Sequence, residues 1–291
     1  MKRFATGSPD TLLNKIRDIP SLPEVVNRII QLLGKPNTPA SEIAQLIAYD
    51  PGLTSKVLRM VNSAAYGFQR QISSVQHAIM ILGFNTIRGL VLSASIFKLF
   101  EKQGNTNALD QREIWEHSII TAMTARVIAT HLRLPEADDA FSAGMLHDVG
   151  KMVLDVHFNQ DYIRVLKAAQ GTFHGETFSE LEREILGTTH AEVGSFLANK
   201  WKLPISISQV IEYHHTPEKA TSCESLVYLI ALANELSSVV YMSEEAFQLD
   251  SIRPDVVAYF RLSEGELGHI VQLLREELSG QEEFIDIFSV I

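Results

Sequence analysis

Apolar residues along this chain recur with the period of an α-helix almost throughout, and the alternating pattern of a β-strand is nearly absent. The first such stripe covers residues 22–33. Thr38-Pro39 and Asp50-Pro51 each indicate a helix N-cap followed by a proline in the first turn, and so mark the starts of the next two helices. Further stripes over 73–83, closed by a glycine, and over 85–100 complete five short helices. The first hundred residues therefore predict a compact helical bundle.

A polar stretch, residues 101–110, interrupts the helical pattern and contains Gly and Asn. We place a domain boundary within it, which divides the chain into residues 1–107 and 108–291. Helical stripes resume after the boundary. They cover 114–131, 137–156, 162–169 and 178–186.

The remaining helices have recognisable ends. Thr189 and Glu192 have the spacing of a capping box, and they predict a helix that reaches Trp201. Another helix begins at Pro204 and ends at His214-His215. The last predicted helices cover 226–241, 254–259 and 265–278. The predicted fold is all-α and two-lobed.

Composition limits the partners that we expect. The formal net charge is −10, which argues against a general basic surface for nucleic acid or anionic membrane. The most apolar run that we identify, 227–242, is interrupted by polar residues and is too short to span a bilayer. No apolar segment follows the charged start of the chain, and Cys223 is the single cysteine. We therefore expect a soluble protein of the cytoplasm.

Six potential metal ligands lie in the second half of the chain. Imidazole and carboxylate side chains bind divalent transition metals, and no cysteine is among these six. The set is His117, His147, Asp148, His190, His214 and His215. They lie at or near predicted helix ends, beside apolar stripes that would point them inward. The other five histidines have no identifiable partner in the sequence, and we interpret them as structural: His77, His131, His157, His174 and His269.

The most specific local signal is the string from Ala143 to Lys151, AGMLHDVGK. Gly144 would let a neighbouring helix approach closely, and Gly150 weakens a helix and so requires a packing or functional reason. Lys151 follows His147 by one helical turn and shares its face, where it could meet an anionic ligand. Glu113 lies one turn before His117.

This string resembles the HD superfamily of metal-dependent phosphohydrolases, named for its His-Asp doublet. The more specific resemblance is to the HDOD family, a divergent bacterial signalling branch, and it covers roughly residues 19–242. It rests also on segments of the first half and on two later ones. These are LP at 22–23, DPGLT at 50–54, VNSAAYG at 61–67, ISSV at 72–75, AI at 78–79, LG at 82–83, WKLP at 201–204 and the His214-His215 pair.

The resemblance implies a role for each candidate residue. His117, His147 and Asp148 match the HD-type metal ligands, and three further histidines match the additional ligands of the cyclic-dinucleotide branch: His190, His214 and His215. Lys151 would meet phosphate, and Glu113 matches an optional carboxylate that could bridge or orient. With Asp148 these two make up the implied catalytic set. The neutral imidazoles favour Fe, Mn, Zn or Ni, as one or two ions.

The sequence departs from the implied pattern at two places. Asn234 stands where the HD pattern has its closing Asp, and a neutral amide is a weaker ligand that does not offset metal charge. The Gly-Tyr-Pro signature of cyclic-di-GMP hydrolysis does not follow His214-His215, where residues 216–218 read TPE instead. Both departures put the cyclic-dinucleotide reaction in doubt.

Three functions remain open at this point. The first is a signalling regulator with a metal-competent pocket and little or no turnover; the second is an active phosphodiesterase or phosphomonoesterase; the third is a structural scaffold. The resemblance implies that residues 1–107 are an interaction lobe for a protein partner, and that the HD-like half could take a phosphate-containing small molecule or nucleotide. Nucleic-acid binding is not expected, since Arg59, Arg70 and Arg88 are few and scattered.

Overall fold

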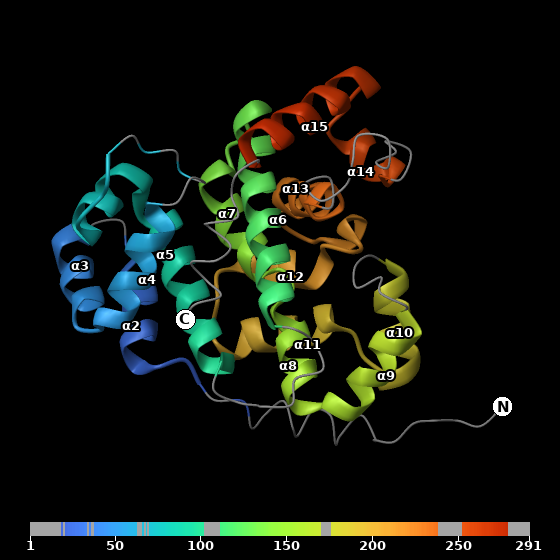
Figure 1. The fold of residues 1–291 in the computed structure, drawn as a ribbon, viewed down its shortest axis with the longest axis horizontal. Coiled ribbons are helices and arrows are strands. Elements are labelled where there is room, and N and C mark those ends of the chain that lie inside the picture. Colours follow the sequence, from blue (N-terminus) through green and yellow to red (C-terminus); the bar gives the residue numbers. More distant parts are fainter. Residues whose placement is uncertain are drawn as a thin grey trace.

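The computed structural model describes residues 19, 21–33, 35, 38–62, 66, 68, 70–101, 111–169, 176–237 and 252–278. These residues are helical or irregular, and no strand occurs among them, so the all-α prediction is confirmed (Figure 1). The helices of the first hundred residues are α2 (Glu24–Leu33), α3 (Ala40–Ala48), α4 (Pro51–Val61) and α5 (Val75–Glu101). The following helices are α6 (Gln111–His131), α7 (Ala137–Leu146), α8 (Val149–His157), α9 (Asn159–Ala169), α10 (Glu176–Leu186), α11 (His190–Lys200), α12 (Ile205–Tyr213), α13 (Glu224–Leu236), α14 (Pro254–Tyr259) and α15 (Glu264–Leu278).

The two helix starts that the sequence predicts at Thr38-Pro39 and Asp50-Pro51 have different outcomes. Asp50 caps α4 as expected, because its side chain accepts a hydrogen bond from the Leu53 amide at 3.0 Å. The prediction for Thr38 is wrong. Pro39 itself stands at the N-cap of α3, and the Thr38 hydroxyl donates instead to the Leu32 carbonyl at 2.8 Å. Thr38 therefore closes the end of α2.

Helix α5 contains the two helices that the sequence predicts over 73–83 and 85–100. Gly83 separates them with φ 77° and ψ 172°, a conformation that glycine adopts without steric cost. The segment Val75–Phe100 is long and apolar enough to cross a membrane by composition, which our choice of 227–242 as the most apolar run did not anticipate. However, 61% of its most apolar window is buried inside the fold, as in the core helix of a globular protein.

The single helix predicted over 137–156 is instead two helices, α7 and α8. The break falls at Asp148, which has φ −99° and ψ 12°. The Lys151 amide, in the first turn of the new helix, donates to the Asp148 carbonyl at 2.9 Å. The apolar period continues across the break, which is why periodicity alone did not reveal it.

Most other predicted helix ends are confirmed within a few residues. The capping box of Thr189 and Glu192 is present at the start of α11, and α12 follows Pro204 and ends before His214. Helices α14 and α15 occupy the predicted ranges. The predicted continuation of α13 from 238 to 241 lies outside the described residues. Residues 102–110, which contain the predicted domain boundary, and His174 also lie outside them.

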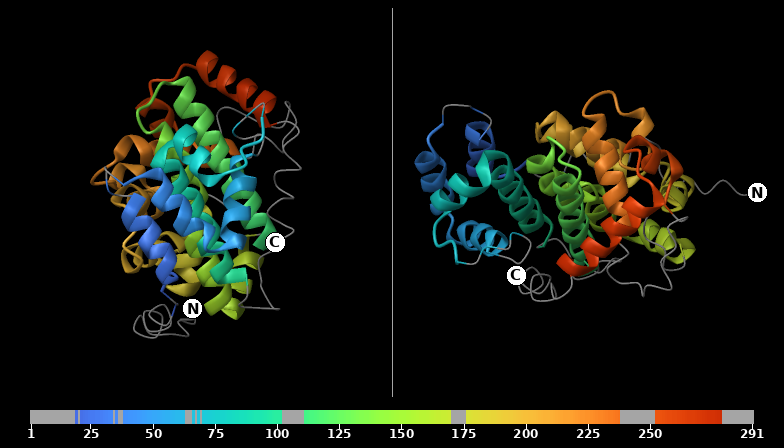
Figure 2. Two further views of the ribbon diagram at one scale, coloured as in Figure 1. Left: turned by 90° about the vertical axis from the view of Figure 1, so that its left-hand side faces the viewer. Right: turned by 90° about the horizontal axis from the view of Figure 1, so that it is seen from above.

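The described helices pack around one continuous apolar core. Helices α2, α3 and α4 pack against α5, which in turn packs against α7; α7 also contacts α6, α12 and α13. In Figure 2, the helices of residues 24–101 gather on one side of the molecule and the later helices on the other. Helices α6, α7, α8, α11 and α12 thus surround the region where the six candidate ligands lie.

Candidate metal centre

The six candidate ligands come from four places in the chain and converge, as predicted. His117 belongs to α6, the His147-Asp148 doublet lies at the break between α7 and α8, His190 begins α11, and the last two histidines follow α12. Their ligand atoms form two groups, each within 4.8 Å, that share Asp148. One group is His117, His147 and Asp148, and the other is Asp148, His190, His214 and His215.

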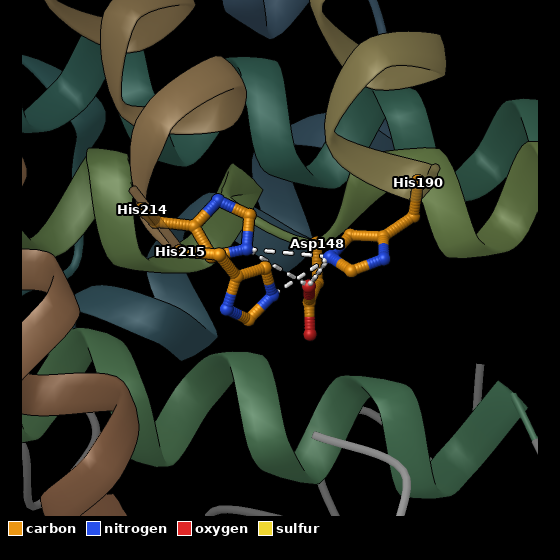
Figure 3. A group of neighbouring side chains, drawn as sticks. All are labelled: Asp148, His190, His214 and His215. Carbon is orange, nitrogen blue, oxygen red and sulfur yellow. Dashed lines mark hydrogen bonds and ion pairs between the residues drawn. The ribbon is translucent and has the colours of Figure 1, made fainter. Parts of the chain in front are cut away.

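The second group surrounds one oxygen of the carboxylate. Asp148 Oδ1 lies 3.3 Å from His190 Nε2 and 3.6 Å from His214 Nε2. His190 Nε2 also lies 3.0 Å from His215 Nε2 and 3.3 Å from His214 Nε2. Figure 3 shows the rings of His214 and His215 turned toward His190 across the Asp148 carboxylate.

The first group surrounds the other oxygen. Asp148 Oδ2 lies 3.3 Å from His147 Nε2 and 3.5 Å from His117 Nε2. The Lys151 ammonium donates to the same oxygen at 2.7 Å. Asp148 therefore stands between the two groups, with one oxygen toward each, as a carboxylate that bridges two ligand sets would.

Hydrogen bonds at Nδ1 determine which ring nitrogen of each histidine carries the proton. His147 Nδ1 lies 2.7 Å from the Gly144 carbonyl, and His214 Nδ1 lies 3.1 Å from the Val210 carbonyl. His190 Nδ1 lies 2.6 Å from Glu182 Oε2. Carbonyl and carboxylate oxygens only accept, so Nδ1 is the protonated nitrogen in each ring. In the neutral imidazoles, the lone pair is then at Nε2, which faces the cluster.

His117 is oriented in the same way through a hydroxyl. Ser237 Oγ donates to the Asn234 carbonyl at 2.7 Å, so its proton is already used. The Ser237 oxygen, 3.4 Å from His117 Nδ1, can therefore accept from that ring. Asn234 is buried, and its side-chain Oδ1 has no hydrogen-bond partner among the described residues.

The arrangement fits a bound divalent metal. Lone pairs that face one another repel unless a proton or a cation lies between them, and bound metal would satisfy them directly. Bonds of about 2.0–2.1 Å in tetrahedral geometry place ligand atoms about 3.3 Å apart. Within the group of Asp148, His190, His214 and His215, four separations between ligand atoms, from 3.0 to 3.6 Å, lie around that value.

Burial sets the charge state of the cluster. It lowers the pKa of His214 to about 4 and holds the pKa of His215 well below its usual range. Burial alone would raise the pKa of Asp148, but the neighbouring charges of His147 and Lys151 outweigh it and hold that pKa well below its usual range. At neutral pH, His214 and His215 are therefore neutral imidazoles and Asp148 is an ionised carboxylate, the forms that bind metal.

The two glycines of the AGMLHDVGK string have packing reasons. A Cβ on Gly150 would lie 1.8 Å from the His190 carbonyl oxygen, and one on Gly144 would lie 2.5 Å from the Ala122 Cα. Glycine at these positions lets α8 approach α11 and lets α7 approach α6. Both contacts bring the His147-Asp148 doublet close to the ligands on the neighbouring helices.

Three residues that support the cluster were not predicted. Glu182 contacts His190, Ser237 contacts His117, and the Arg253 guanidinium donates to the His215 carbonyl at 2.6 Å. A sequence signal existed for Glu182 alone: it follows buried Phe178 by four residues, so a carboxylate lies on the apolar face of α10. Nothing local marks the other two.

Lys151 and Glu113, two residues of the implied catalytic set, differ in burial. Lys151 is buried beside Asp148. Glu113 is exposed in the first turn of α6. The role of Glu113 as a bridging or orienting carboxylate stays a prediction.

Comparisons with known proteins agree with this picture. The HDOD domain family matches residues 19–217. A solved structure of an HDOD domain protein of unknown function from Geobacter sulfurreducens is 27% identical, with a TM-score of 0.72 over 96% of this chain and 97% of that one. An uncharacterized protein of Treponema pallidum is 23% identical over 94% of this chain and 52% of its own length.

A shorter similarity links the chain to an enzyme. Ribonuclease Y of Thermus thermophilus is 29% identical over 127 residues, which are 44% of this chain and 17% of that protein. The chain spans about half the length of the Treponema relative, and less of the ribonuclease.

Proposed function

Because the chain belongs to the HDOD family, we propose that it is a signal-transduction regulator whose HD-like half binds a divalent transition metal with little or no turnover. The observation that carries this proposal is the enclosure of the cluster. Imidazole Nε2 atoms surround the buried carboxylate of Asp148, and each of the six candidate ligands is at most 9% exposed. A phosphate ester would reach a metal there only if part of this covering opened.

The residues of the cluster have distinct roles in this proposal. Asp148 and the histidines hold the metal, and Lys151 balances the charge of Asp148 across a 2.7 Å contact. A bound divalent metal would lower the pKa of a coordinated water toward 7. For Lys151 to meet a phosphate as implied, its ammonium would have to leave Asp148. The buried amide of Asn234 adds no negative charge to the site.

The first helices serve as the interaction part of the protein. We propose that residues 1–107 form a lobe that contacts a protein partner, and that residues 108–291 form the HD-like lobe with the metal pocket. The family match runs across this boundary, since it covers residues 19–217. A phosphate-containing small molecule or nucleotide is the ligand class proposed for the pocket. The proposal includes a cytoplasmic location and no binding to nucleic acid or membrane.

An active metal-dependent phosphohydrolase, either a phosphodiesterase or a phosphomonoesterase, is the second candidate. It is favoured by the complete set of six candidate ligands in the structure and by the similarity to ribonuclease Y. A buried ammonium beside the shared carboxylate would also suit phosphate chemistry.

Metal content and hydrolysis distinguish the candidates. The protein is purified without chelator, its metals are measured by mass spectrometry, and hydrolysis of bis(p-nitrophenyl) phosphate and p-nitrophenyl phosphate is measured with added Mn or Fe. We expect bound transition metal, and hydrolysis no faster than that of Asp148→Ala. Asp161→Ala is the matched control, because Asp161 forms a partly exposed pair with Arg164 away from the cluster.

Two results would contradict the proposal that the protein is a regulator. Hydrolysis that is lost in Asp148→Ala and kept in Asp161→Ala would establish the enzyme. The wild-type protein could instead purify metal-free and stay inert with added metal, while His147→Ala keeps the signalling output. These results would show that the cluster has only a structural role.

A further inference from the structure

Glu182 is a fully buried carboxylate that faces the cluster from α10. It lies eight residues before His190, on the helix that precedes α11, and none of its surface is exposed. Burying a carboxylate is costly unless hydrogen bonds satisfy it. The contacts of Glu182 therefore show what this carboxylate is placed to do.

Both carboxylate oxygens have partners. Oε2 accepts from the His190 backbone amide at 2.8 Å and lies 2.6 Å from His190 Nδ1. Oε1 accepts from the Tyr162 hydroxyl at 3.3 Å. One oxygen thus holds both the backbone and the ring of the same residue, at the first position of α11.

The support of His190 differs from that of the other ligands. His147 and His214 direct Nδ1 to neutral backbone carbonyls, and His117 lies beside a hydroxyl. Among these four histidines, His190 is the one that donates to a carboxylate. A negatively charged acceptor makes an imidazole a stronger electron donor at its other nitrogen and fixes its tautomer.

We propose that Glu182 is a positioning residue that strengthens one half of the centre selectively. It fixes the orientation of the His190 ring, and thereby the geometry of the group formed by Asp148, His190, His214 and His215. The group formed by His117, His147 and Asp148 does not depend on it. This inference rests on the proposed metal site. It implies that the two ligand groups bind metal with different affinities.

The test replaces Glu182 with Gln, which keeps the volume and removes the charge. Metal affinities are measured by competition with a chromophoric chelator, with Zn²⁺ and then with Co²⁺, whose visible spectrum reports ligand geometry. In Glu182→Gln, we expect the affinity of one bound ion to fall about 10- to 100-fold and that of the other to stay unchanged.

Glu192→Gln is the matched control. Glu192 is also a carboxylate at the start of α11, where its side chain accepts from the Thr189 amide at 3.2 Å and bonds to Arg183. It supports the helix end, while Glu182 is the carboxylate that contacts the His190 ring. We expect Glu192→Gln to lower stability and to leave both metal affinities unchanged. Equal losses of affinity in the two variants would overturn the proposal, and so would two unchanged affinities in Glu182→Gln.

A measurement on the metal-free protein separates this proposal from the proposed function. The ¹⁵N and ¹H NMR signals of the His190 imidazole should show a strongly deshielded Nδ1 proton, which disappears or moves upfield in Glu182→Gln. If wild type binds no metal, the proposed function fails, and these signals still decide the role of Glu182. Identical His190 signals in wild type and Glu182→Gln would overturn it.

Discussion

Asn234 and Asp148 show how much depends on single side chains in this cluster. Asp148 is the carboxylate of both ligand groups, and its charge is already matched by Lys151. Asn234 is buried with an unsatisfied Oδ1, and its backbone carbonyl accepts from the hydroxyl beside His117. An aspartate in place of Asn234 would therefore add a second buried acid on α13, next to the carbonyl that holds this hydroxyl.

Replacing Asn234 with Asp should tighten metal binding. The added negative charge offsets part of the metal charge in a buried site, so we expect affinity to rise by about tenfold, which corresponds to about 1.4 kcal/mol. Chelator competition measures the change. Asn199→Asp, on the exposed side of α11, makes the same substitution away from the cluster and should leave affinity unchanged. An unaltered affinity in Asn234→Asp would show that this side chain does not face the metal.

At the scale of elements, close helix crossings bring the ligands together. Helix α8 approaches α11 at Gly150, where there is no room for a Cβ beside the His190 carbonyl. The break between α7 and α8 then places His147 and Asp148 at the same junction. Each ligand is presented from a helix end or a helix face whose position is set by such a contact.

Gly150→Ala should therefore disturb both stability and the site. The new Cβ would lie 1.8 Å from the His190 carbonyl oxygen, so the two helices must separate, and we expect a loss of about 3 kcal/mol in the free energy of unfolding. Metal binding should weaken with it.

Gly268→Ala in α15 is the comparison, because a Cβ there meets nothing within 4 Å. It should stabilise the protein by roughly 0.5–1 kcal/mol through helix propensity. Urea unfolding measures both changes. An equally stable Gly150→Ala protein would contradict the close crossing.

At the scale of the whole molecule, the buried histidines link stability to pH. The folded pKa of His214, about 4, lies below its usual value of 6.5. Between these two values, the unfolded chain takes up a proton that the folded protein does not. The free energy of unfolding should therefore be highest above pH 6.5 and decrease as pH falls toward 4.

In metal-free protein, we expect His214 to contribute a loss of roughly 3 kcal/mol across this range. Urea unfolding in the presence of chelator at a series of pH values measures it. His214→Gln should flatten the profile, whereas His77→Gln, at an exposed position on α5, should reproduce the wild-type shape. Parallel profiles for wild type and His214→Gln would be inconsistent with burial of the neutral ring.

The sequence by itself determined the features that depend on neighbours along the chain. The helical period, the Asp50 cap, the Thr189–Glu192 capping box and the glycine break at Gly83 are all local signals, because they depend on residues within a few positions of one another. The six candidate ligands could also be named, since their residue types and the family resemblance marked them.

The tertiary structure decided the rest, because it depends on partners that lie far apart in the sequence. Glu182 became part of the site through a contact across α10 and α11, and Ser237 lies 120 residues from His117. The same holds for the end of the helix at Asp148, where the apolar period gives no sign of a break. Local rules describe where a helix begins, but the packing of one helix against another decides which side chains meet.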